Sequence, residues 1–161
     1  MDRPPTHEDA NLILRLYEMR REPRLREARR WFAASFHAAT FEEFQRLCPP
    51  GSEENASYRM VTSYWEMVAS FVNRGILHQE LYFESGGEML FVWERIVDLL
   101  PHLRAAQKNP KALGNVEAVV ARFQAWWAER APDFYAQFRN NVRGAGAPPK
   151  PAPPLEIPHT D

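Results

Sequence analysis

The sequence predicts an all-α fold, a single-domain bundle of about five to seven helices, several of them broken by proline. Apolar side chains recur at spacings of three and four through most of the chain, which places them on one face of a helix. No stretch alternates apolar and polar residues as a half-buried strand would, so no sheet is expected. Capping residues and prolines stand where these helical patterns begin and end.

Pro23 separates the first two predicted helices and can serve as the first residue of the second. Thr6 and Asp9 have the spacing of a capping box, in which each side chain binds the other residue's backbone N–H. Thr40 and Glu43 repeat that spacing before a short third helix. The apolar faces of the first two helices comprise Leu12, Leu16, Met19, Leu25, Ala28, Phe32 and Phe36.

The longest predicted helix covers residues 56–74 and ends at Gly75, a residue suited to the left-handed turn after a helix. Its apolar residues cover so wide an arc that other elements are expected to pack on more than one side. The next segment, residues 76–83, fits a short helix or an extended connector equally well. Ser85 and Glu88 then predict a third capping box, for a helix that reaches about residue 100.

Prolines also divide the C-terminal third of the chain. Pro101 is expected to bend or restart the preceding helix. Asn109 and Pro110 predict the start of a helix to about residue 131, and Pro132 starts another one. We therefore expect a bundle domain over residues 1–143. Residues 144–161 carry six prolines, which predicts a disordered tail.

Composition narrows the class of protein. A chain of 161 residues with 45% hydrophobic residues is long and apolar enough for one core. No apolar run approaches the roughly 20 residues that span a bilayer, and the first residues lack the layout of a signal peptide. We therefore expect a cytoplasmic protein. The single cysteine, Cys48, excludes an internal disulfide and metal motifs built on paired cysteines.

Glu66 is the most conspicuous polar residue of the long helix, because it lies among aromatic and aliphatic neighbours. On a helix it falls on a narrow strip with Thr62, Ser63, Ser70 and Asn73, which are small and uncharged. Such a strip suits the close approach of another element. Two interpretations of Glu66 remain open: an exposed or arginine-paired side chain, or a partly buried carboxylate that acts as general acid or base.

Motifs of metal and nucleotide chemistry are missing from the sequence. Within residues 1–143 no histidine has the E-x-x-H or H-E-x-x-H spacing, and the E-x-x-H of Glu156 and His159 lies in the proline-rich tail rather than on a predicted helix. Neither phosphate-binding glycine motif nor the G-x-S-x-G nucleophile motif occurs. Cys48 precedes two prolines and has no local histidine to activate it, so it is expected to be an ordinary thiol. We therefore expect no metal and no cofactor.

Residues 15–30 hold seven arginines and three glutamates, although the net charge of the chain is −1. Residues 78–98 hold five acidic residues and only one arginine, which offers an internal counterpart. We expect ion pairs between the two segments. A nucleic-acid surface on the arginine segment is the weaker interpretation, because glutamates interrupt the basic residues.

Three sequence blocks carry a resemblance: LYEMRREPRLREARRWF, YRMVTSYWEMVASFVNRGIL, and ESGGEMLFVWERI with the LLPHLR that follows. Together they resemble a family of small, uncharacterised bacterial all-helical proteins, a domain of unknown function, over roughly residues 10–120. The resemblance implies an all-α fold and a bacterial origin, and it carries no activity or site. Charged residues embedded in these blocks form a candidate buried polar network of Glu66, Arg21, Arg29, Arg59 and Glu88.

Three hypotheses for function follow. The leading one is a non-enzymatic, cytoplasmic protein-interaction or regulatory domain, in which Trp126 and Trp127 would face a protein partner or a second copy of the chain. The alternative is a ligand-binding protein or enzyme with a pocket formed by Glu66 and the N-terminal arginines. The third is a nucleic-acid-associated protein that uses residues 15–30.

Overall fold

The structure, a computed structural model, describes residues 3–144, and over this range the chain is all-α without a strand, as predicted. The elements in order are α1 (His7–Arg20), α2 (Pro23–Ser35), α3 (Phe41–Leu47), α4 (Glu53–Asn73), α5 (Gln79–Ser85), α6 (Glu88–Ile96), the 3-10 turn η1 (Val97–Leu99), α7 (Leu100–Ala106), α8 (Gly114–Arg130) and α9 (Pro132–Gly144). These are more helices than the expected five to seven, because the connector before α6 and the stretch around Pro101 form separate short helices.

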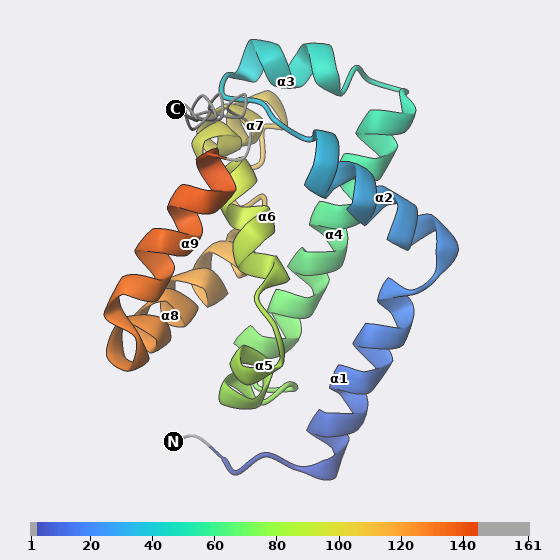
Figure 1. Cartoon of the computed structure of the whole chain (residues 1–161). Helices are drawn as coiled ribbons and strands as arrows, with labels where there is room; N and C mark the ends of the chain where they lie inside the picture. The colour runs from blue at the N-terminus through green and yellow to red at the C-terminus, as the bar shows by residue number, and fades with distance from the viewer. Residues whose placement is uncertain (1–2, 145–161) are drawn as a thin grey trace, which may run out of the picture.

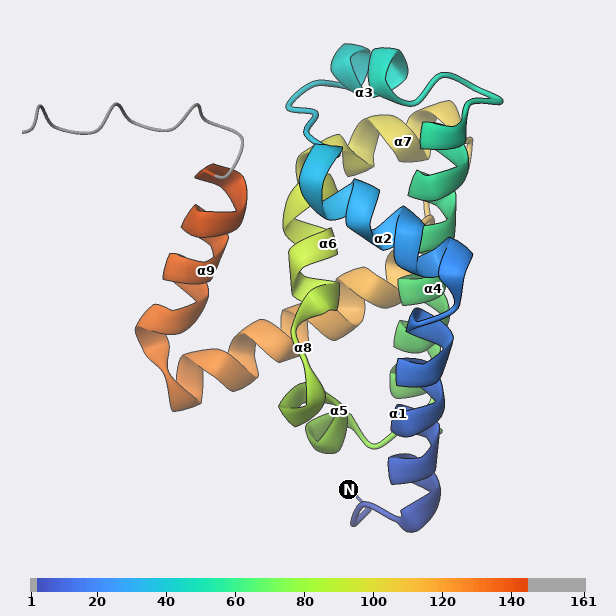
Figure 2. The ribbon, with the colours of Figure 1, turned by 45° about the vertical axis from the view of Figure 1, so that its right-hand side comes forward.

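The long helix α4 is the centre of the bundle (Figure 1), and its closest packing partners are α2 and α8. Helix α1 lies on one side of α4, while α8 and α9 form a helical hairpin on the other side (Figure 2). The short helices α3 and α7 close one end of the bundle, and α5 lies at the opposite end, near the N-terminus. Since α4 is covered on several sides, its wide apolar arc is accounted for.

Aromatic residues fill much of the core. Phe32 of α2 and Phe36, which directly follows α2, stack with ring centroids 4.5 Å apart, and Phe36 also stacks on Tyr58 of α4. At the other end of the core, Phe83 and Phe123 stack at 4.1 Å and join α5 to α8. Aromatic pairs of this kind add to the free energy gained by burial alone.

Several helix ends follow the local signals of the sequence. The capping boxes of Thr6 with Asp9 and of Thr40 with Glu43 are both present. Pro23 and Pro132 are the first residues of α2 and α9. These signals act over three or four residues, so no tertiary contact is needed to set them.

Two predicted helix starts are wrong. Ser85 does not cap α6; it is the last residue of α5, and its hydroxyl donates to the carbonyl of Leu81 at 2.6 Å. Glu88 is therefore free to bind the guanidinium groups of α1 and α2. The last long helix starts at Gly114 rather than at Asn109, because Leu113 adopts a left-handed conformation with φ of 56° and redirects the chain.

Asp9 fastens the N-terminal segment to the bundle. Its carboxylate is 1% exposed and accepts two hydrogen bonds of 2.6 Å from the Arg3 guanidinium. It also accepts from the backbone N–H groups of Thr6 and His78, both at 2.8 Å. The Arg3 guanidinium and these N–H groups hold the pKa of Asp9 well below its usual range, despite the opposing effect of burial.

Helix α9 is held to α6 by the buried carboxylate of Glu94. That carboxylate accepts a hydrogen bond from the Tyr135 hydroxyl and one of 2.8 Å from Nε of Arg143. Arg143 also pairs with the exposed Asp98 at 3.0 Å. The hairpin of α8 and α9 is therefore anchored by a polar contact as well as by its aromatic side chains.

The predicted tail, residues 144–161, lies outside the described residues except for Gly144, which ends α9. Among the helices of residues 3–144, none combines the length and apolar character that crossing a membrane requires.

Candidate functional site

Glu66 caps the start of α8. Its carboxylate accepts hydrogen bonds from the backbone N–H of Asn115 at 3.1 Å, the Asn115 side-chain amide at 2.8 Å and the backbone N–H of Val116 at 3.0 Å. The first turn of a helix leaves its N–H groups without partners inside the helix, and Leu113 supplies no side-chain cap. The Glu66 carboxylate therefore satisfies these N–H groups and places a negative charge at the positive end of the helix dipole.

The small polar strip around Glu66 is the surface on which α8 approaches α4, as its composition predicted. Asn73 belongs to this strip, and its side-chain amide donates to the backbone and side-chain oxygens of Asn115 at 3.2 and 2.9 Å. Arg122 donates to Asn73 Oδ1 at 2.6 Å. No hydrogen bond or ion pair within residues 3–144 joins Glu66 to an arginine, so neither earlier interpretation of this residue describes its partners.

Glu88 is the acidic centre of an ion-pair cluster with two arginines from the basic segment. It binds Arg29 through two parallel contacts, with Nε at 2.6 Å and Nη2 at 2.5 Å, and it also pairs with Arg20. A forked guanidinium matches a carboxylate best in this two-contact geometry. The pairing expected between the basic and acidic segments is thus present for these two arginines.

The other residues named from the sequence lie apart from this cluster. Arg21 and Arg59 are exposed, and their side chains make no hydrogen bond or ion pair within residues 3–144. Trp126 and Trp127 are partly buried: Trp126 packs beside Phe83 and Phe123, while Trp127 contacts Phe134 of α9 at a centroid distance of 4.0 Å. The α8–α9 hairpin thus covers part of the tryptophan surface within the chain itself.

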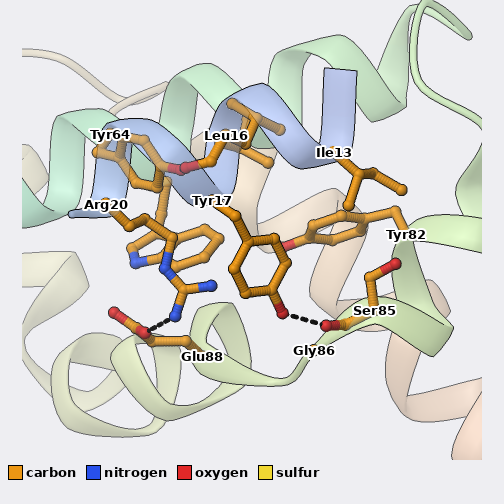
Figure 3. Close-up of a pocket in the computed structure, with 11 residues that line it drawn as sticks. Ile13, Leu16, Tyr17, Arg20, Tyr64, Tyr82, Ser85, Gly86 and Glu88 are labelled. Carbon is orange, nitrogen blue, oxygen red and sulfur yellow. Dashed lines mark hydrogen bonds and ion pairs between the residues drawn. The ribbon is translucent and has the colours of Figure 1, made fainter. Parts of the chain in front are cut away.

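A cavity lies beside the Arg20–Glu88 pair, between α1, α4, α5 and α6 (Figure 3). We call it the α1–α6 cavity; its polar lining comprises Tyr17, Arg20, Tyr64, Trp65, Tyr82 and Glu88. The volume open to the centre of a water-sized sphere is about 20 Å³, and the whole empty space including the mouth is about 330 Å³. This cavity contains an N-terminal arginine, whereas Glu66 lines a different, open depression together with Arg59, so the structure does not bring Glu66 and the N-terminal arginines into one pocket.

Sequence reasoning did not single out Trp65 or Tyr82 as site residues, because both have the spacing of core residues. They are 4% and 6% exposed, respectively. The polar atom of each side chain is buried and has no hydrogen-bond partner within the described residues, and the same holds for Nε of Arg20. A local sequence pattern cannot predict this, since it depends on which helices meet around each side chain.

A second, open depression lies between α2 and α6, and we call it the α2–α6 groove. Its apolar floor includes Ala33 and Phe91, and Arg26, Arg29 and Arg30 line its side. Arg29 is occupied by Glu88, whereas Arg26 and Arg30 are exposed and make no ion pair within residues 3–144. The groove therefore combines apolar surface with two available positive charges.

Metal ligands do not gather anywhere in the part of the chain that the structure describes: no group of three or more His, Cys, Asp or Glu side chains is placed to hold an ion. Cys48 is 2% exposed, and burial raises the pKa of its thiol to about 11. A thiol with so high a pKa is a poor nucleophile at neutral pH.

Comparison with known families identifies the chain. Residues 5–123 match the family described as Domain of unknown function (DUF4760), and the chain belongs to this family. The match ends within α8, so the second half of that helix and α9 lie beyond it. No curated protein and no solved structure matches the chain.

Proposed function

We propose that this member of a family of unknown function is a non-enzymatic, cytoplasmic protein-interaction domain of bacterial origin. Its α2–α6 groove receives an acidic, partly apolar segment of a partner protein. The observation that carries the proposal is that the groove lining combines the apolar Ala33 and Phe91 with Arg26 and Arg30, which have no ion partner within residues 3–144. Protein interfaces combine an apolar centre with a charged rim in this way.

The hydrogen bonds of Glu66 and the ion pairs of Glu88 support a role without catalysis. Glu66 is held by the first turn of α8, and Glu88 is held by Arg20 and Arg29. A general acid or base has to reach a substrate proton, and neither carboxylate is available while it keeps these partners.

A protein partner fits the groove better than a nucleic acid does. Within the described part of the chain, Arg26 and Arg30 are the two groove arginines without an ion pair, and Glu88 lies in the same lining. Nucleic-acid affinity depends mainly on the number of phosphates that are neutralised, so two cations beside a carboxylate form a weak site. The apolar floor, in contrast, suits Leu, Ile or Phe side chains of a peptide segment.

The test uses a photo-crosslinking amino acid in place of Ala33, on the exposed face of α2, in cells of the source organism. We expect one discrete protein adduct whose cross-linked peptide is acidic. The adduct should fall about tenfold or more in an Arg26→Glu, Arg30→Glu double variant, because two rim attractions become repulsions. Arg21→Glu is the matched control, since Arg21 is exposed and unpaired but does not line the groove.

Three outcomes would overturn the proposal. The first is equal adduct in the double variant and in the Arg21→Glu control. The second is an adduct only with a second copy of the chain, which would instead support a homodimer. The third is retention of DNA or RNA at low salt that requires Arg26 and Arg30, which would support the nucleic-acid reading.

A further inference from the structure

The α1–α6 cavity concentrates buried donors that have no acceptor. Nε of Arg20, Nε1 of Trp65 and the hydroxyl of Tyr82 are each buried without a hydrogen-bond partner among residues 3–144, and all three side chains line this one cavity. Figure 3 shows the Tyr82 hydroxyl directed into the group of side chains that also contains Tyr17 and Arg20. Folded proteins rarely leave buried polar groups unpaired, because each costs free energy, so three such side chains in the lining of one cavity call for an explanation.

The electrostatics of the cavity favour an acceptor with negative charge. Glu88 is shared by two guanidinium groups, those of Arg20 and Arg29, which leaves an excess of one positive charge beside the cavity. The Arg20 guanidinium lies 5.4 Å from the centre of the Trp65 ring, so this charge is close to the indole. Burial raises the pKa of Tyr82, and its hydroxyl therefore stays protonated and able to donate.

A single water does not satisfy this set of donors. A water oxygen has two lone pairs and accepts two hydrogen bonds, whereas three donors line the cavity. A carboxylate offers two oxygens and about four acceptor positions in a space little larger than a water. Its charge also offsets the excess positive charge of the two arginines.

The lining of the cavity also suits a short apolar group. Ile13 and Leu16 of α1 and Val68 of α4 supply aliphatic surface to it. The Tyr17 hydroxyl donates to the carbonyl of Ser85 across the mouth, as Figure 3 shows. A Cβ on Gly86 would lie 3.1 Å from that hydroxyl, so the absence of a side chain at this position allows the closing contact.

We propose that the α1–α6 cavity binds a short-chain apolar monocarboxylate, whose oxygens accept hydrogen bonds from Trp65, Tyr82 and Arg20 while its hydrocarbon part lies against Ile13 and Leu16. The enclosed part holds the carboxylate, and the space toward the mouth holds the chain. Opening requires only that Tyr17 releases Ser85. The cavity shares Glu88 with the α2–α6 groove, but Trp65, Tyr82 and Arg20 line the cavity and not the groove, so variants of these donors test this proposal independently of the proposed protein partner.

Calorimetric titration of the purified full chain with butyrate tests the proposal. We expect a dissociation constant below ~1 mM, within the affinity that so few ligand atoms can reach. Tyr82→Phe removes one donor and keeps the ring, whereas Trp65→Phe removes the indole N–H together with part of the indole. Each should weaken binding about tenfold or more. Butan-1-ol, which carries no charge, should bind at least about tenfold more weakly than butyrate.

Matched controls separate the site from a general effect on folding. Trp127→Phe removes another buried indole N–H without a partner, but outside the cavity. Tyr58→Phe removes the hydroxyl of a buried tyrosine that packs on Phe36 and Phe44, also outside the cavity. Both controls should bind butyrate as the unaltered chain does.

The proposal is overturned if butyrate at ~10 mM gives no binding heat, if the two control variants lose affinity as much as the cavity variants, or if butan-1-ol binds as well as butyrate. A crystal structure grown with butyrate gives an independent result. Carboxylate density within hydrogen-bond distance of Trp65 Nε1 and the Tyr82 hydroxyl supports the site. Ordered water alone in the cavity overturns it.

Discussion

Replacement of Glu66 by alanine should destabilise the protein by detaching the start of α8 from α4. The carboxylate accepts three hydrogen bonds from Asn115 and Val116, and Leu113 provides no substitute cap. The N–H of Gly114 already donates to Lys111 and that of Glu117 to Leu113. The two backbone N–H groups between them depend on Glu66 alone, so the variant leaves both without a protein acceptor.

The size of the effect follows from these contacts. Loss of a helix cap costs about 0.5–2 kcal/mol, and loss of a negative charge at a helix start costs about 0.3–1 kcal/mol. The bond from the Asn115 side chain adds about 0.5–1 kcal/mol, because that amide remains partly accessible to water. We expect a fall of about 2–3 kcal/mol in the free energy of unfolding and of about 5–10 °C in Tm. Glu66→Gln keeps one acceptor oxygen and should lose less.

Urea unfolding followed by circular dichroism measures the free energy, and amide hydrogen exchange locates the loss. Glu84→Ala is the control, since Glu84 is exposed and its side chain makes no hydrogen bond or ion pair within residues 3–144. The amides of Asn115 and Val116 should lose protection before those in the rest of α8. A change below ~0.5 kcal/mol, or equal losses in Glu66→Ala and Glu84→Ala, would refute this account of Glu66.

Three further predictions follow from buried groups. Contacts in the folded state lower the pKa of Asp9, so its stabilising effect is complete above the unfolded pKa of about 4 and is lost as the pH falls below that value. In acid-unfolding curves, Asp9→Asn should therefore flatten the fall in the free energy of unfolding between about pH 4 and 2. An unchanged slope would contradict this. The Cys48 thiol is buried and has a pKa of about 11, so at pH 8 it should react with a thiol reagent slowly in the folded chain and fast in denaturant. Equal reaction rates in the two conditions would contradict its burial. Without butyrate, Tyr82→Phe should leave the free energy of unfolding unchanged or raise it by up to about 1 kcal/mol, because the variant removes a buried hydroxyl that has no hydrogen-bond partner within residues 3–144. A loss above ~1 kcal/mol in a urea titration would show that the hydroxyl is paired.

The sequence predicted part of the candidate site and not its geometry. The strip around Glu66 correctly indicated close approach of another element, because small side chains at helical spacing have that consequence wherever they occur. The partner of Glu66 could not be predicted, since Asn115 lies 49 residues away in the chain. In the same way, Glu88 has the spacing of a capping residue, yet it binds Arg20, which is 68 residues distant.

The sequence by itself determined the all-α class and those helix ends that depend on neighbouring residues, such as the capping box at Thr6 and the start of α9 at Pro132. Hydrophobic periodicity and capping act within a few residues, so they can be read without a fold. Only the tertiary structure decided that Trp65 and Tyr82, whose buried donors have no partner within residues 3–144, line one cavity. It also decided that α8 starts after the left-handed Leu113, where Glu66 caps it. These features arise where distant helices meet, because burial and hydrogen-bond pairing depend on every element around a side chain rather than on its neighbours in the sequence.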